Sequence, residues 1–290
     1  MTTSHEKREL VLVTGASSGI GKATADRLAA DGFHVLAGVR SQADADQIAR
    51  SGIEPVILDV TNGDHVVAVA TRVENDPEKR ALRAVINNAG VAVNAPIEVL
   101  SAADWRAQFD ASFFGPIALT RALMSALLAG RGRILNITSV GGRVAMANFG
   151  AYSAAKFALE AATDSLRREV EPFGITVVKI TPGAVSTQLT ERGLAAAARV
   201  ADTMTPDQRE RYAELGKAFT AQVTGWARDG VTPEHAASVI SRAVTARRPK
   251  TRYTIGRDGA LFSFMPRIAS DRLLDAMLAG QNRRLARAAS

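Results

Sequence analysis

Short apolar runs alternate along the chain with longer segments whose apolar residues recur at helical spacing. The runs are rich in Val, Ile and Leu, and they cover residues 10–14, 33–39, 54–60, 82–87, 132–138 and 175–181. An unbroken apolar run predicts a strand that is buried on both faces, as in a parallel sheet covered by helices. The segments between the runs, such as 19–32 and 101–128, predict those helices.

This alternation predicts an α/β fold class, with a doubly wound parallel sheet in a three-layer α/β/α arrangement. A further strand is expected around residues 252–255, where it would complete the sheet. The chain contains no short-period repeat and no linker rich in Pro, Gly and Ser. We therefore interpret residues 1–290 as a single domain.

The composition is typical of a globular protein without disulfides, since 47% of the 290 residues are hydrophobic and none is cysteine. No apolar stretch approaches the ~20 residues that cross a bilayer. The first ten residues lack the apolar core of a signal peptide. The sequence therefore predicts a cytoplasmic protein, and no spacing of His, Asp and Glu suggests a metal site.

The formal net charge of +7 arises near the C-terminus. Residues 242–290 contain 11 basic and 3 acidic residues, whereas residues 1–241 contain 25 basic and 26 acidic ones. Because the main body is nearly neutral, we expect no nucleic-acid partner. The basic, helical extension over about 257–290 could contact an anionic membrane surface. We favour packing against the body or against a second subunit of a homo-oligomer.

A glycine-rich turn with the sequence TGASSGIG, from Thr14 to Gly21, follows the first strand and opens the first helix. In this context glycines let the backbone approach a pyrophosphate, and the free N–H groups of the helix start favour its negative charge. A tight turn that binds nothing would carry the same glycines. If the turn binds a dinucleotide, it indicates a Rossmann-type fold and a dinucleotide-binding domain.

Further motifs appear in register after this turn. They are Asn87–Gly90 after the fourth strand, Ser139, a Tyr-x-x-x-Lys motif formed by Tyr152 and Lys156, Pro182-Gly183 after the sixth strand, and Thr187. Their order and spacing resemble the short-chain dehydrogenase/reductase (SDR) family over roughly residues 10–187. Segments such as ILDVT and the surroundings of Tyr152 are similar to the retinol and steroid dehydrogenase branch of that family.

The resemblance implies an NAD(P)-dependent oxidoreductase, which would interconvert an apolar primary or secondary alcohol and its aldehyde or ketone by hydride transfer. The residues that it places at the cofactor are Gly15, Ser17, Ser18, Gly19, Ile20, Gly21, Arg40, Asp59, Val60, Asn88, Ala89, Gly90, Tyr152, Lys156, Pro182, Gly183, Val185 and Thr187. Asp59 resembles the family's acceptor for the adenine amino group. Its alternative role is to cap the helix after Thr61.

Tyr152 and Lys156 lie four residues apart in a helical stretch, so their side chains share one face. A phenol with a pKa of about 10 is protonated at neutral pH, and a nearby cation favours the phenolate. We therefore expect Lys156 to lower the pKa of Tyr152. The resemblance assigns proton transfer to Tyr152 and a hydrogen bond with the substrate oxygen to Ser139. The alternative is an exposed pair on an amphipathic helix.

One position departs from the family pattern. In the segment FDASFFG, Ser112 stands where the family has an asparagine that helps to hold a water between the lysine and bulk solvent. Ser112 is therefore a candidate catalytic residue whose proton relay would be weakened or rerouted, although we favour a tolerated substitution. An impaired relay would allow a second class of function, a cofactor-binding sensor or scaffold. The intact Ser139, Tyr152 and Lys156 argue against that alternative.

The end of the second strand bears on the choice between NAD and NADP. An acidic residue there would accept hydrogen bonds from the ribose 2′-hydroxyl, whereas an arginine pairs with a 2′-phosphate. The strand ends with Val39, Arg40 and Ser41, without an acid. We therefore expect NADP, bound through the planar guanidinium of Arg40, with NAD as the alternative.

The segment over about 184–231 occupies the place of the family's helical substrate lid. The candidate wall residues of the substrate pocket are Val93, Val140, Met146, Phe149, Val185 and Leu189. All are apolar, and no Arg or Lys stands among them to bind a carboxylate or phosphate. The predicted partner is therefore a small apolar alcohol or ketone.

Overall fold

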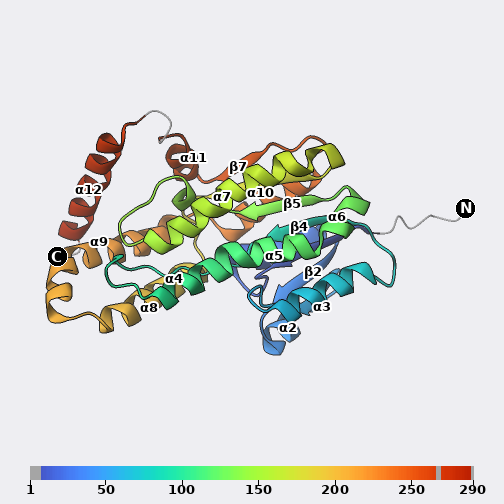
Figure 1. Ribbon diagram of the computed structural model, residues 1–290, viewed down its shortest axis with the longest axis horizontal. Helices are drawn as coiled ribbons and strands as arrows, with labels where there is room; N and C mark the ends of the chain where they lie inside the picture. The colour runs from blue at the N-terminus through green and yellow to red at the C-terminus, as the bar shows by residue number, and fades with distance from the viewer. Residues whose placement is uncertain (1–7, 266–268, 289–290) are drawn as a thin grey trace, which may run out of the picture.

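Seven parallel strands form one sheet at the centre of the protein, as Figure 1 shows for a computed structural model that describes residues 8–265 and 269–288. In spatial order they are β3 (Ile53–Ile57), β2 (His34–Val39), β1 (Leu10–Thr14), β4 (Leu82–Asn87), β5 (Arg133–Ile137), β6 (Thr176–Pro182) and β7 (Arg252–Ile255). The predicted Rossmann-type, doubly wound α/β fold is confirmed, including the strand at 252–255. The predicted N-terminal segment and C-terminal extension include residues 1–7, 266–268 and 289–290, which lie outside the described residues.

Helices cover both faces of the sheet. On one face lie α1 (Gly19–Ala30), α2 (Gln42–Ile48) and α10 (Pro233–Thr245); on the other lie α3 (Gly63–Glu74), α5 (Gly115–Ala122), α6 (Met124–Gly130) and α7 (Gly150–Val170). The helix predicted over 101–128 is divided into α4 (Ala102–Phe109), a π-helical turn η1 (Asp110–Phe114), α5 and α6.

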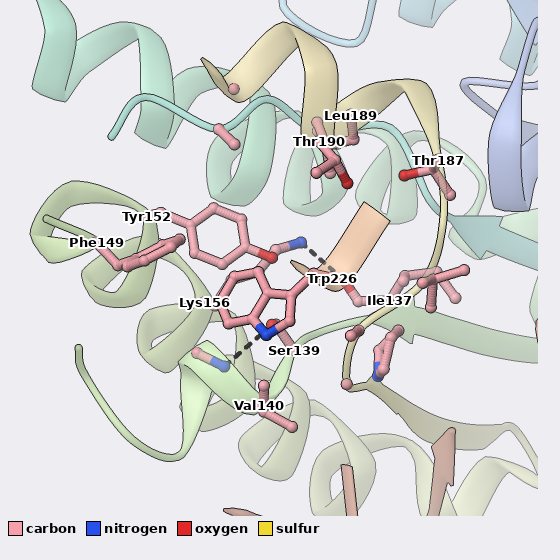
Figure 2. Close-up of a pocket in the computed structure, with 18 of the residues that line it drawn as sticks. Ile137, Ser139, Val140, Phe149, Tyr152, Lys156, Thr187, Leu189, Thr190 and Trp226 are labelled. Atoms are coloured by element: carbon pink, nitrogen blue, oxygen red, sulfur yellow. Dashed lines mark hydrogen bonds between the residues drawn. The ribbon is translucent and has the colours of Figure 1, made fainter. Parts of the chain in front are cut away.

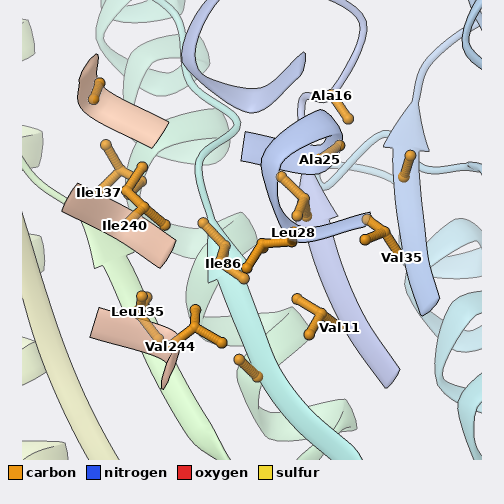
Figure 3. Close-up of a cluster of buried hydrophobic side chains, with 14 of the residues drawn as sticks. Val11, Ala16, Ala25, Leu28, Val35, Ile86, Leu135, Ile137, Ile240 and Val244 are labelled. Carbon is orange, nitrogen blue, oxygen red and sulfur yellow. The ribbon is translucent and has the colours of Figure 1, made fainter. Parts of the chain in front are cut away.

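Side chains of each strand alternate between the two faces, and both sets are apolar. In β1, Val11 and Val13 belong to the cluster beneath α1 and α10 shown in Figure 3. Leu10 and Leu12 belong to the cluster beneath α3, α5 and α6. All four side chains are fully buried. This burial on both faces explains why the strands read as unbroken apolar runs.

The strand order reverses between β1 and β4, because β2 and β3 lie on one side of β1 and the later strands lie on the other. At such a switch point the loops that leave the carboxyl ends of the two strands run in opposite directions and leave a crevice between them. The glycine-rich turn after β1 and the loop after β4 therefore meet at one edge of the sheet.

Two helices, α8 (Gln188–Asp202) and α9 (Pro206–Asp229), occupy the predicted lid segment between β6 and α10. After β7 come α11 (Arg257–Phe264) and α12 (Asp271–Ala288), and α12 packs along α9 (Figure 1). Within the described part of the chain, no single helix has the length and apolar character needed to cross a membrane. By length and composition alone, one pair bent by 58°, residues 102–122 with 124–130, meets those criteria.

Candidate active site

Three glycines shape the turn between β1 and α1. Gly15 and Gly19 have φ angles of +65° and +54°, which residues with a side chain rarely adopt. A Cβ atom on Gly21 would lie only 2.1 Å from the backbone oxygen of Gly15. The path of this turn therefore depends on glycine at all three positions.

The start of α1 offers backbone donors to an anion. Ser18 is the N-cap residue, but its side chain forms no capping hydrogen bond, and the first turn contains no acidic residue. Ser17, Ser18 and Gly19 line a cavity of about 150 Å³. A pyrophosphate fits this set of donors, because uncapped N–H groups at a helix start carry partial positive charge.

The loop after β4 is bound directly to the glycine-rich turn. The side-chain amide of Asn88 donates to the backbone oxygens of Thr14 and Gly15 at 2.9 and 3.2 Å. In return, Thr14 Oγ1 accepts from the backbone N–H groups of Asn88 and Ala89 at 2.9 and 2.8 Å. Asn88 thus lines the crevice, as predicted, and also holds its two walls together.

Arg40 and Asp59 line the same cavity on the side of β2 and β3. The Arg40 side chain forms no hydrogen bond or ion pair with the part of the chain that the structure describes, so its donors are free for a ligand. Asp59 Oδ1 accepts from the N–H and the hydroxyl of Thr61 at 2.9 and 2.7 Å. Burial alone would raise the pKa of Asp59, but these bonds and the charge of Arg40 lower it. Asn62, rather than Asp59, caps α3.

A second cavity, of about 220 Å³, adjoins the first and shares several lining residues with it, including Asn88, Gly90 and Thr187. Tyr152 and Lys156 project into this region from α7, and Ser139 lies after the end of β5 (Figure 2). The predicted catalytic residues Ser139, Tyr152 and Lys156 therefore meet in the second cavity.

Lys156 is 6% exposed, and its Nζ donates to the backbone oxygen of Ile137 at 2.8 Å. It lies 5.9 Å from the centroid of the Tyr152 ring. Burial lowers the pKa of Lys156 to about 8. Burial also raises the pKa of the Tyr152 phenol, and a hydrogen bond with Ser139 opposes that rise. The net shift of the phenol pKa is therefore upward, opposite to the direction expected from the charge of Lys156, because desolvation dominates.

The hydroxyl of Ser139 is fixed beside Tyr152. Ser139 Oγ accepts from the backbone N–H of Gly141 at 3.0 Å. A Cβ atom on Gly141 would lie 2.9 Å from Cε1 of Tyr152, so glycine at this position lets the phenol ring approach the loop closely. Two side-chain oxygens are thus held close to each other at the cavity wall.

Ser112, which the sequence places among the catalytic residues, is fully buried in η1 and lines neither cavity. Its Oγ accepts from Nε2 of Gln108 at 2.8 Å, and the same amide bonds to two backbone groups of the loop after β4. Ser112 Oγ and Lys156 Nζ lie 3.4 and 3.9 Å from the point where a Cβ on Gly90 would stand. Both groups therefore lie near Gly90. Gln108 supplies a buried amide beside Ser112, which could not be recognised from the sequence.

Most of the predicted residues line at least one of the two cavities. They are Gly15, Ser17, Ser18, Gly19, Ile20, Arg40, Asp59, Val60, Asn88, Ala89, Gly90, Ser139, Tyr152, Lys156, Pro182, Gly183, Val185 and Thr187, with the wall residues Val140, Met146, Phe149 and Leu189. Gly21 is buried beneath the turn. The prediction that Val93 lines the substrate pocket is wrong. Its side chain packs in a separate apolar cluster with Leu100.

Other lining residues carry no motif that the sequence analysis could use. Asn94, Thr190, Trp226 and Phe262 line the cavity that holds Tyr152, and Arg192 lines the cavity beside the glycine-rich turn. They come from a loop, from both lid helices and from α11, which only the tertiary fold brings together. Over residues 8–265 and 269–288, no group of three or more His, Asp or Glu side chains could hold a metal ion.

Comparison with known proteins finds relatives that are similar in sequence and in fold. Residues 9–197 match the model of the short chain dehydrogenase family. The chain is 33% identical to retinol dehydrogenase 16 of Homo sapiens, covering 93% of this chain and 89% of that protein. It is 34% identical to 3-amino-tetrahydro-pyrrolizinone reductase of Xenorhabdus hominickii, covering 88% and 90%. A crystal structure of a short-chain dehydrogenase from Streptomyces avermitilis has a TM-score of 0.74 and 29% identity, covering 95% of each chain.

Proposed function

The chain belongs to the short-chain dehydrogenase family and is an oxidoreductase that acts on CH–OH groups, and from this premise we propose that it interconverts an apolar alcohol and its ketone or aldehyde with NADP(H). One observation carries the proposal. The Tyr152 hydroxyl lies in an apolar cavity that adjoins a cleft whose helix start and free arginine suit a dinucleotide.

The residues that fit the cofactor are already in place. The uncapped start of α1 at Ser18 and Gly19 suits the pyrophosphate, Arg40 suits a 2′-phosphate, and Asp59 suits the adenine amino group. When bound, the nicotinamide ring supplies or accepts the hydride. The absence of an acidic residue after Val39 is the reason that we propose NADP rather than NAD.

Proton transfer falls to Tyr152. Because burial raises the pKa of its phenol, the group holds its proton at neutral pH and can donate it to a substrate oxygen. Ser139 stands beside it as a hydrogen-bond donor for the same oxygen. Lys156 is protonated below about pH 8, and its charge stabilises the phenolate that remains after the transfer. In alcohol oxidation the phenolate takes the proton back.

The lining of the cavity supports an apolar substrate. Val140, Met146, Phe149 and Trp226 contribute apolar surface. Among the described lining residues, Lys156 is the only charged one, and its ammonium group already donates to a backbone oxygen. The cavity thus offers little to bind a carboxylate or phosphate. The similarity to a protein named retinol dehydrogenase also supports an apolar alcohol.

We further propose that the protein works as a cytoplasmic homo-oligomer. Phe114 in η1 and Phe157 in α7 are 55% and 43% exposed, and these two elements pack against each other. Their apolar surface supports contact with a second subunit. The alternative of a sensor or scaffold without turnover is not proposed, because no observation in this site favours it.

The cofactor proposal is tested by titrating NADPH and NADH into the protein and into Arg40→Ala. Loss of a charge-assisted hydrogen bond should weaken NADPH binding by about 1.5 to 3 kcal/mol. NADH has no 2′-phosphate, so its affinity should hardly change and it serves as the internal control. Equal losses for both cofactors would place Arg40 away from the phosphate and contradict the NADP preference.

A further inference from the structure

Asn94 differs from the other buried polar side chains of the substrate cavity. It lies in the loop between β4 and α4, lines the cavity that contains Tyr152, and is only 4% exposed. Its amide oxygen is buried and accepts no hydrogen bond from the residues described by the structure. A buried amide is normally hydrogen-bonded, so this one has unused capacity.

The neighbouring polar groups of the same cavity are already engaged. Lys156 donates to the Ile137 oxygen, the Ser139 hydroxyl accepts from Gly141, and the Asn88 amide donates to the glycine-rich turn. These bonds fix the catalytic end of the cavity. The Asn94 oxygen therefore stands out as an acceptor that the fold itself does not use.

Helix α8 packs closely against this amide on the side of its nitrogen. Gly193, buried in α8, faces Asn94, and a Cβ atom at that position would lie 3.3 Å from Asn94 Nδ2. One turn earlier in α8, Thr190 reaches into the cavity on the side away from Ser139 and Val140 (Figure 2). A side chain at position 193 would press on the amide, whereas glycine leaves it beside the cavity.

We propose that Asn94 is a specificity-determining residue that accepts a hydrogen bond from a second polar group of the substrate. The ligand class is an apolar ketone or alcohol that carries a hydroxyl or N–H group remote from the reacting carbon. Such a donor would satisfy the amide oxygen on binding, whereas a purely apolar analogue would leave it unpaired. The inference rests on the proposed function, since it concerns the substrate of the same site.

The test uses matched 2-alkanones of six to ten carbons, each with and without a terminal hydroxyl, reduced with NADPH. The wild-type protein should prefer the hydroxylated member of at least one pair in kcat/KM. In Asn94→Leu this preference, taken as the ratio of kcat/KM for the two members of the pair, should fall by at least about tenfold. A thermal melt and the Kd for NADPH report whether the variant is folded, because Asn94 does not line the cofactor cleft.

Thr190→Val is the matched control, because it removes another hydrogen-bonding group from the same cavity and should leave the preference in place. Asn94→Ala, with a smaller side chain, should repeat the loss if Asn94→Leu is unstable. The inference is overturned if no pair shows a preference, if the preference survives both Asn94 variants, or if Thr190→Val alone abolishes it. Failure of the wild-type protein to reduce any ketone would instead overturn the proposed function.

Discussion

Among the proposed catalytic residues, Lys156 titrates closest to neutral pH, because burial lowers its pKa to about 8. Its positive charge is present below that pH and is lost above it. In reduction this charge stabilises the Tyr152 phenolate, so kcat for ketone reduction should fall as pH rises through about 8. Alcohol oxidation requires the phenolate of Tyr152. The pKa of this phenol is raised, so the phenolate fraction, and with it the oxidation rate, should increase with pH up to that pKa.

Initial rates in both directions, measured between about pH 6 and pH 10, check this dependence. Cofactor and substrate must be kept saturating so that binding does not contribute to the profile. A reduction rate that increases from about pH 7 to about pH 9 would contradict the role assigned to the Lys156 charge.

Ser112 is fully buried, and its hydroxyl is already bonded to Gln108. Asparagine is larger, so Ser112→Asn would crowd η1 and displace the Gln108 amide. We expect no gain in turnover and a loss of about 1 to 3 kcal/mol in the free energy of unfolding. Thermal melts beside steady-state kinetics measure both effects. Higher turnover at unchanged stability would instead show that the proton relay lacks an amide.

Residue types with a chemical signature could be predicted from the sequence, and those without one could not. The glycines and the Tyr152 motif were recognised because few other side chains can replace them. Gln108 was missed since its role depends on a partner one turn away and on backbone groups of another loop. The predicted direction of the Tyr152 pKa shift was wrong, because residue spacing shows which side chains are neighbours but not how far they are desolvated.

Helix α9 connects the substrate cavity to the C-terminal helix. Val223 and Trp226 of α9 line the cavity. Helix α12 packs along α9. A protein that ends at Ser270 should therefore lose support for the lid. We expect KM for an apolar ketone to rise roughly three- to tenfold, which corresponds to about 1 kcal/mol, together with a lower Tm.

Cofactor affinity provides the control for this truncation, since the cleft beside the glycine-rich turn includes no residue of α12 among those described. The Kd for NADPH should stay within about twofold of the full-length value. An unchanged KM, or an equal loss of cofactor and substrate binding, would contradict a specific support of the lid by α12.

Element boundaries were predicted well where burial and strand pairing coincide. β3 is the exception, because it ends at Ile57 although the apolar run continues to Val60. Leu58 and Val60 are buried beneath α3 without belonging to a strand. Apolar character alone therefore predicted a strand that extends too far. The π-helical turn η1 was likewise invisible, since helical spacing of apolar residues does not reveal an added residue in one turn.

The topology of the sheet determines where the candidate active site forms. The reversal of strand order places the turn after β1 beside the loop after β4, and α7 brings Tyr152 to the same edge of the sheet. The alternating pattern predicted the parallel sheet with helices on both faces, but it did not give the strand order. The substrate end also needs Trp226 in α9 and Phe262 in α11, which lie far from Tyr152 in the sequence and carry no signal of their own.

We propose that Tyr152 transfers a proton to a substrate oxygen while the cofactor exchanges a hydride. The most direct test follows nicotinamide absorbance during reduction of an apolar ketone by the wild-type protein and by Tyr152→Phe, with NADPH affinity measured for both. We expect the wild-type protein to consume NADPH. The variant should have a roughly 10²- to 10⁴-fold lower kcat and a nearly equal NADPH affinity. A variant that turns over at close to the wild-type rate, with the same NADPH affinity, would contradict the account.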